Sequence, residues 1–243
     1  MKNIFSKAGI AMVMAFGLSA AVLAVPADFA AKLASPDRPA ADKARDEARR
    51  PLETMEVLGV QEGWTVVDVS AGGGWFTWVL SAAVGPQGKV LSQAGERALQ
   101  NNNGQAQRDM AAKLGNVEPV FTGMDGIPAG TADAAVTALN LHDAYNFRGE
   151  VGAQAFLAEI FNVLKPGGVA AIIDHDGTLE MNNAELHRLP AEIARAQILK
   201  AGFEIVAESN ILDHPVDDHT KSSNDESLGR MTDQFLFVVR KPA

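Results

Sequence analysis

The sequence predicts an α/β fold built on a doubly wound sheet of seven strands, mostly parallel, with the last strand antiparallel. Short runs of β-branched and apolar residues recur along the chain and alternate with segments of helical spacing. This alternation is typical of a parallel sheet covered on both faces. The connection before the final run lacks a helical period, so the last two strands are expected to pair antiparallel. A chain of 243 residues, 47% of them apolar, is long enough for one domain with a substantial core.

The expected strands are short and rich in apolar residues. They occupy residues 65–70, 89–93, 117–122, 132–139, 169–174, 203–209 and 234–240. The expected helices between them occupy residues 74–84, 96–114, 150–164 and 190–201. The third of these helices is expected to stop at Pro166-Gly167-Gly168, because proline and glycine are strong termination signals. A charged helical segment precedes the first strand, and Pro51 is expected to break or restart it.

The first 24 residues are expected to be a cleaved secretory signal. Lys2 and Lys7 occur there without an acidic residue, and an apolar run follows that closes on small residues. A membrane anchor is the alternative, because about 17 apolar residues is the short limit for spanning a bilayer. Residues 25–36 are expected to form a linker or a surface strap, and residues 37–243 a single domain. This organisation predicts a periplasmic or secreted protein with no stable membrane insertion after signal cleavage.

Charge and cysteine content exclude several classes of partner and modification. The formal net charge is −9, and loss of the signal removes two positive charges and no negative one, which gives −11. A body of that sign repels phosphate, so no nucleic-acid partner is expected. The chain has no cysteine, so neither a disulfide nor a lipidated cysteine is possible. These observations leave the oligomeric state open.

A glycine-rich turn follows the first expected strand and reads Asp68-Val69-Ser70-Ala71-Gly72-Gly73-Gly74. In doubly wound sheets, ligands bind beyond the carboxyl ends of the strands, and the first strand-to-helix turn usually lies there. Glycines let a ligand approach the backbone amides, and the following helix presents its partly positive end. Asp68 could hold the loop amides or accept a hydrogen bond from a ligand ammonium group. The alternative is that the glycines only pack a tight turn.

This turn, the segment Gly88-Lys89-Val90 and the segment Leu164-Lys165-Pro166-Gly167-Gly168 together resemble the class I S-adenosylmethionine-dependent methyltransferases. In that family the turn has the pattern D-x-G-x-G-x-G, and Ser70 stands at its first glycine. Over about residues 36–243 the chain is similar to an exported branch of predicted methyltransferases. The resemblance implies a Rossmann-like fold and S-adenosyl-L-methionine as the cofactor. The cofactor-binding residues that it implies are Asp68, Ser70, Gly72, Gly73, Gly74, Glu96 and Asp125.

The end of the second strand departs from the family pattern. The family usually has an acid there that grips both ribose hydroxyls, and this position falls on Ala94, with Glu96 two residues later. Asp125 stands where the family often holds the adenine amino group, although an Asp-Gly turn explains it equally well. The charged segment at residues 45–50 is either a solvated helix face or, as the resemblance implies, a lid over the cleft.

Histidines follow two of the central strands. His142 and Asp143 follow the fourth strand and His175 follows the fifth, while His187 and Arg188 lie in the next connection. If these strands are parallel, all of them border one cleft. Histidine titrates near neutrality, so His142 or His175 is a reasonable general base, and Arg188 could hold a substrate carboxylate or phosphate. The catalytic residues that we predict are His142, Asp143, His175, His187 and Arg188.

The sequence therefore predicts an S-adenosylmethionine-dependent methyltransferase that acts on a small molecule outside the cytoplasm. One alternative is an enzyme of the same fold that has lost the methyl donor and uses the His/Asp cluster for hydrolytic, lyase or metal-assisted chemistry. Ala94 and the export signal favour that alternative. A noncatalytic ligand-binding protein is the other. No metal site is predicted, because the tight spacing of an H-x-E-H pattern is missing, although His and Asp suit zinc and other divalent ions.

Overall fold

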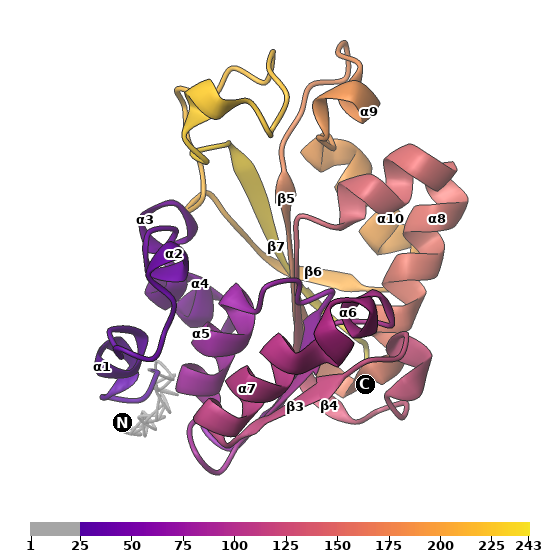
Figure 1. The fold of residues 1–243 in the computed structure, drawn as a ribbon. Helices are drawn as coiled ribbons and strands as arrows, with labels where there is room; N and C mark the ends of the chain where they lie inside the picture. Colours follow the sequence, from indigo (N-terminus) through magenta and orange to yellow (C-terminus); the bar gives the residue numbers. More distant parts are fainter. Residues whose placement is uncertain (1–24) are drawn as a thin grey trace, which may run out of the picture.

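The computed structural model describes residues 25–243, and the expected signal at residues 1–24 lies outside the described residues. One seven-stranded sheet forms the middle of the fold, with strand order β3-β2-β1-β4-β5-β7-β6 (Figure 1). Neighbouring strands are parallel except at β7, which runs antiparallel to both β5 and β6. The predicted doubly wound sheet with a reversed last strand is confirmed.

The observed strands lie close to their predicted positions. They are β1 (Thr65–Val69), β2 (Lys89–Gln93), β3 (Val117–Val120), β4 (Ala132–Ala138), β5 (Leu164–His175), β6 (Glu204–Ser209) and β7 (Gln234–Arg240). Only β5 begins well before its predicted start at residue 169. Leu164 already pairs with Ala132 of β4, and the backbone N–H of Gly167 donates to the carbonyl of Lys241. The Pro-Gly-Gly turn therefore ends the preceding helix as expected and also joins the sheet.

The helices differ more from the prediction. They are α1 (Phe29–Leu33), α2 (Ala40–Lys43), α3 (Asp46–Arg49), α4 (Pro51–Leu58), α5 (Trp75–Val84), α6 (Arg97–Gln100), α7 (Gln105–Leu114), α8 (Leu141–Val163), α9 (Asn183–Leu186) and α10 (Ala191–Lys200), with 3-10 turns η1 (Asn102–Gly104), η2 (Met124–Gly126) and η3 (Glu226–Leu228). The single helix predicted over 96–114 is wrong, because Asn102 and Asn103 have φ of 49° and 53° and divide it. Helix α8 begins at Leu141 rather than at residue 150, with a break at Gly149 (φ 61°). Pro51 starts α4, as predicted.

Residues 25–36, expected as a linker or a surface strap, contain α1. Phe29 and Leu33 of α1 are buried against α5. Burying two large apolar side chains stabilises this segment on the domain. No helix in the described part of the chain is both long and apolar enough to cross a membrane.

Two hydrophobic cores lie on opposite faces of the sheet. On β1, Val66 belongs to one core and Val67 to the other, because successive side chains of a strand point to opposite faces. Helices α1, α4 and α5 pack on one face, and α8 and α10 pack on the other (Figure 1). The carboxyl ends of the parallel strands meet at one edge of the sheet, together with the loop before β7.

Candidate active site

The glycine-rich turn between β1 and α5 leaves open space above its backbone. Gly72 has φ of 54°, and a Cβ built there would meet only the carbonyl oxygen of Ser70, at 3.9 Å. A Cβ on Gly73 would meet no atom within 4 Å, whereas one on Gly74 would lie 2.6 Å from the sulfur of Met110. A ligand can therefore approach the backbone at Gly72 and Gly73, while Gly74 allows close packing on α7.

Ser70 is held in the left-handed region, with φ of 52°. A residue with a Cβ is less stable there by about 1 to 2 kcal/mol, which is why the family pattern has glycine at this position. The backbone N–H of Ser70 donates to Oε1 of Gln93 at 2.9 Å, and Nε2 of Gln93 donates to the carbonyl of Thr122 at 3.0 Å. The Gln93 side chain thus ties the turn to the ends of β2 and β3. This role of Gln93 was not predicted, although a polar residue at the end of a buried strand was a usable signal.

Asp68 is buried at the end of β1 and faces a cavity of about 170 Å³ beside the glycine-rich turn, hereafter the turn cavity. Burial raises the pKa of its carboxyl to about 7, although the Thr77 hydroxyl and the charge of Arg49 oppose this rise. The Thr77 hydroxyl donates to Oδ2 of Asp68 at 2.6 Å. A cationic ligand group in the turn cavity would stabilise the ionised form of Asp68.

Two arginines of the charged segment before β1 form one wall of the turn cavity. Arg45 and Arg49 both line it, and the Arg49 guanidinium lies 5.1 Å from the centroid of the Trp75 ring. Burial and the neighbouring charge of Arg45 lower the pKa of Arg49 to about 10. Asp46 fixes the segment, because it accepts a hydrogen bond from Nε1 of Trp75 at 3.0 Å and pairs with Arg38 at 2.5 Å. Of the two alternatives for residues 45–50, the structure favours the one that places them over the cleft.

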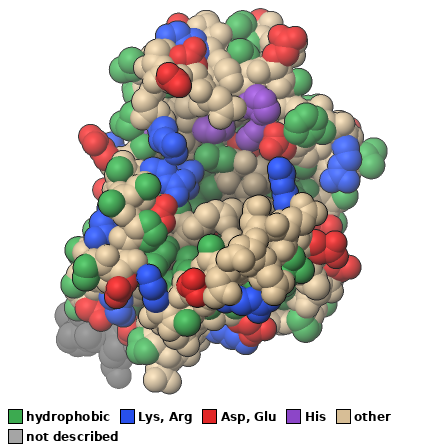
Figure 2. Space-filling view, in the orientation of Figure 1, with side chains coloured by type: hydrophobic (Ala, Val, Ile, Leu, Met, Phe, Trp, Pro, Cys, Tyr) green, Lys and Arg blue, Asp and Glu red, His purple; other side chains and the backbone are tan. Residues whose placement is uncertain are grey.

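A larger cavity of about 480 Å³, hereafter the large cavity, shares Arg45, Arg49 and Leu139 with the turn cavity. His175 and Thr232 also line it. Leu139, directly after β4, has φ of 63°, a conformation that a non-glycine residue rarely adopts outside functional or tightly constrained sites. Figure 2 shows the hollow, with histidines at its upper rim and Lys or Arg side chains on its left.

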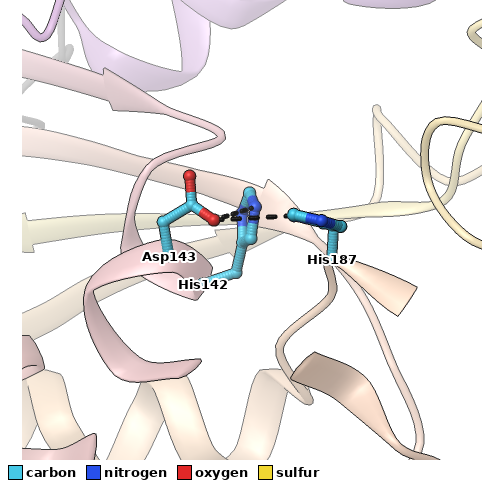
Figure 3. Close-up of side chains that lie close together, drawn as sticks. All are labelled: His142, Asp143 and His187. Carbon is cyan, nitrogen blue, oxygen red and sulfur yellow. Dashed lines mark ion pairs between the residues drawn. The ribbon is translucent and has the colours of Figure 1, made fainter. Parts of the chain in front are cut away.

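The structure brings together four of the predicted catalytic residues: His142, Asp143, His175 and His187. Nε2 of His142 lies 3.2 Å from Oδ1 of Asp143, and Nδ1 of His187 lies 3.6 Å from the same oxygen (Figure 3). The ring centroids of His142 and His175 are 5.7 Å apart. They meet because β4 and β5 are adjacent parallel strands, so that the residues after them share one edge. Their chemical roles stay predictions.

A buried carboxylate that the sequence analysis missed orients the histidine cluster. Oδ1 of Asp174 lies 2.6 Å from Nδ1 of His142, and Oδ2 of Asp174 accepts the backbone N–H of His142 at 2.7 Å. Burial alone would lower the pKa of His142, but the hydrogen bond to Asp174 and the charges of Asp174 and Asp143 raise it. Burial lowers the pKa of His175 to about 4, and Nδ1 of His175 lies 2.8 Å from the Thr232 hydroxyl. The pKa values of the two rings are therefore shifted in opposite directions, and the rings have different hydrogen-bond partners.

The prediction that Arg188 holds a substrate is wrong. Its side chain is fully buried, and NH2 donates to both carboxylate oxygens of Asp217 at 2.8 Å. Nε and NH1 donate to the carbonyls of Lys221 and Asp176. Because Arg188 donates these hydrogen bonds to Asp217 and Lys221, it stabilises the loop between β6 and β7 and does not face the cleft.

The residues present fit the amino-acid end of S-adenosylmethionine better than its ribose end. The turn cavity offers a buried carboxyl for an ammonium group and arginines for a carboxylate. Its volume lies below the roughly 300 to 1,000 Å³ of small-molecule sites, so it takes only part of the cofactor. Beyond it, Ala94 has no acid to offer, while Glu96 and Asp125 are exposed and do not line the turn cavity.

Comparison with known proteins agrees with the fold and the glycine-rich turn. The model of the ubiE/COQ5 methyltransferase family matches residues 46–188. The chain is 25% identical, over 189 residues, to the ubiquinone/menaquinone biosynthesis C-methyltransferase UbiE of Salmonella paratyphi B. The alignment covers 65% of this chain and 73% of that protein.

Solved structures show the same fold at low identity. A SAM-dependent methyltransferase from Aquifex aeolicus superposes with a TM-score of 0.61 at 22% identity, covering 87% of this chain and 97% of that one. The [4+2]-cyclase SpnF superposes with a TM-score of 0.60 at 18% identity, covering 81% of each chain.

Proposed function

The chain belongs to the ubiE/COQ5 methyltransferase family, and from this premise we propose that it transfers a methyl group from S-adenosylmethionine to a small molecule bound in the large cavity. The cofactor and the reaction class follow from the family. The acceptor class and the cellular location are our proposals. The observation that carries the acceptor proposal is the junction at Leu139, where the turn cavity adjoins the large cavity bordered by His175.

In this proposal the turn cavity holds part of the cofactor and the large cavity holds the acceptor. S-adenosylmethionine, when bound, supplies an electrophilic methyl group, so the protein has mainly to hold the acceptor in line with it. Asp68 and Arg49, which line the turn cavity, would hold the ammonium and carboxylate groups of the cofactor. Leu139 lines both cavities and would lie between the two ligands, and His175 would border the acceptor. Arg45 and Arg49 close the near wall and limit the entry of water.

The size of the large cavity supports a small-molecule acceptor. A volume of about 480 Å³ lies within the usual range of roughly 300 to 1,000 Å³ for small-molecule sites. The negative net charge of the chain, −9, is unfavourable for a nucleic-acid acceptor. Arg45, Arg49 and Arg230 line the cavity together with Asp225 and Glu226. The arginines would allow an acceptor with an anionic group to pair on their side of the cavity.

Calorimetric titration with S-adenosylmethionine and with its demethylated product tests this function. We expect saturable binding in the micromolar range, and loss of binding in Gly72→Arg, whose side chain would fill the space over the turn. Gly130→Arg is the matched control, because Gly130 also has positive φ (64°) and open space around it but precedes β4 at the opposite edge of the sheet. Absence of binding at millimolar ligand would reject the proposal and favour an enzyme of this fold with other chemistry. The fold permits this, since the neighbour SpnF is named a cyclase.

We also propose that the protein is exported. Residues 1–24 support this proposal through the lysines that precede an apolar run closing on small residues. A reporter that is active only in an oxidising compartment, fused after residue 30, should be active, and a fusion lacking residues 1–24 should be inactive. Activity in both fusions, or in neither, would contradict export. Retention of the uncleaved chain in the membrane fraction would support an anchor instead of a cleaved signal.

A further inference from the structure

We propose that His142, Asp143 and His187 bind a divalent first-row transition-metal ion at the rim of the cleft. No role as a metal site was expected from the sequence spacing, since the three ligands come from two separate segments of the chain. The proposal does not depend on methyl transfer, because it concerns the affinity of these side chains for an ion.

The three donor atoms already stand at distances that suit one ion. One donor atom from each of His142, Asp143 and His187 lies within 4.8 Å of the other two. Oδ1 of Asp143 is 3.2 Å from Nε2 of His142 and 3.6 Å from Nδ1 of His187. Metal–ligand bonds of about 2.0 to 2.1 Å in a tetrahedral site place neighbouring ligand atoms roughly 3.3 Å apart. Small rotations of the side chains would therefore complete the site (Figure 3).

Asp174 provides an independent observation that points to an ion. This fully buried carboxylate engages Nδ1 of His142 at 2.6 Å, which leaves Nε2 facing Asp143. Histidines that bind metals almost always have the second ring nitrogen held by a carboxylate or a carbonyl, which fixes the tautomer and the ring orientation. The pair Asp174 and His142 has this arrangement inside the protein, where the ring is only 6% exposed.

Among residues 25–243 the ring of His187 has no hydrogen-bond partner, and its backbone lies in the left-handed region. Its φ is 50°, and the next residue, Arg188, is anchored to Asp217. The ring meets that of His142 edge-on, with centroids 5.9 Å apart. A strained conformation that is retained next to a cleft is consistent with a ligand-binding role.

The donor set and its exposure indicate the class of ion. Two imidazoles and one carboxylate suit zinc, iron, cobalt or nickel, whereas calcium and magnesium prefer oxygen ligands alone. Asp143 is 48% and His187 is 41% exposed, so the site opens to solvent. Three protein ligands leave at least one coordination position for water or for an oxygen of a small molecule, as in catalytic zinc sites.

The test uses the full chain without an affinity tag, stripped of metal by chelation. Titration with Co²⁺ should give visible absorption bands that saturate at one ion per chain, and Zn²⁺ should displace the cobalt. His187→Ala and Asp143→Asn should weaken binding at least tenfold, and Asp174→Asn should weaken it by about 10- to 100-fold. His219→Ala is the matched control, since His219 also pairs with a carboxylate, Asp233 at 2.8 Å, but is not one of the three proposed ligands.

Both variants of the exposed ligands keep the buried core intact, and circular dichroism verifies their folding. Unchanged Co²⁺ affinity in His187→Ala and Asp143→Asn would overturn the proposal, because the bound ion would then lie elsewhere. Absence of cobalt bands at millimolar Co²⁺ would also overturn it and would leave the cluster as a pair of histidine–carboxylate contacts. Loss of binding in the two ligand variants together with normal binding in His219→Ala would establish the site.

Discussion

Asp68 provides a quantitative test of the cofactor end of the cleft. Burial raises the pKa of its carboxyl from the ordinary 3.8 to about 7, so the unfolded chain releases this proton at lower pH than the folded protein. Between these two values the folded state binds more protons than the unfolded state. The free energy of unfolding therefore falls as pH rises through this window and levels off above pH 7.

The perturbation is Asp68→Asn, which removes the ionisation and keeps an oxygen for the Thr77 hydroxyl. At 1.36 kcal/mol per pKa unit, the two units between pH 5 and pH 7 correspond to about 2.7 kcal/mol. The free energy of unfolding of the variant minus that of the wild type should be about 2 to 3 kcal/mol larger at pH 8 than at pH 5. Urea unfolding of both proteins at both pH values measures this difference, with Asp37→Asn at an exposed position as the control.

The same carboxyl should make cofactor binding depend on pH. An ammonium group in the turn cavity binds the ionised form of Asp68, so affinity for S-adenosylmethionine should fall by up to about tenfold per pH unit below pH 7. Asp68→Asn should bind weakly and without this dependence. Equal effects of Asp68→Asn on stability at pH 5 and pH 8, or a pH-independent affinity in the wild type, would refute the reasoning.

Three further predictions concern the residues around the cleft. Arg188→Met should lower the free energy of unfolding by about 3 to 5 kcal/mol, because it leaves the buried carboxylate of Asp217 unpaired; urea unfolding measures this loss, and Arg188→Met with Asp217→Leu should recover part of it. Ser70→Gly should change stability by less than about 1 kcal/mol in the same assay, since relief of the left-handed conformation opposes the greater flexibility of glycine, and weakened cofactor binding would show that the hydroxyl touches the ligand. Ala94→Asp should increase calorimetric affinity for S-adenosylmethionine about tenfold or more, because a charge-assisted hydrogen bond contributes about 1.5 to 3 kcal/mol; unchanged affinity would show that the ribose does not lie beside this position.

The sheet could be predicted because its strands are continuous apolar runs. The connections between them indicate which strands run parallel and which run antiparallel. The helices were harder where conformation depends on single residues. Asn102 and Asn103 adopt positive φ, which asparagine tolerates better than most residues, so the run before Gly104 was a signal of a break. In α8 the chain turns at Gly149, and the helical spacing recognised in the sequence describes only the part after this residue.

Site residues could be predicted where the ends of the strands determine their position. They could not be predicted where their position depends on the orientation of a single side chain. His142 and His175 meet because they follow neighbouring parallel strands. His187 and Arg188 are adjacent in the sequence, yet one is 41% exposed beside Asp143 and the other is fully buried. A loop has no period that distinguishes such neighbours. Asp174 carried a signal, because an acid within an apolar strand requires a partner when it is buried.

The energetic cost of Asp68 also bears on whether the chain has kept its methyl donor. A carboxyl held at a pKa of about 7 destabilises the folded protein by up to about 4 kcal/mol above neutral pH. Asparagine would accept the hydrogen bond of the Thr77 hydroxyl without this cost, but only a carboxyl can ionise beside a cationic ligand. Departures from the most stable choice are expected where function requires them. The intact carboxyl therefore argues for retention of the donor more strongly than the missing acid at Ala94 argues against it.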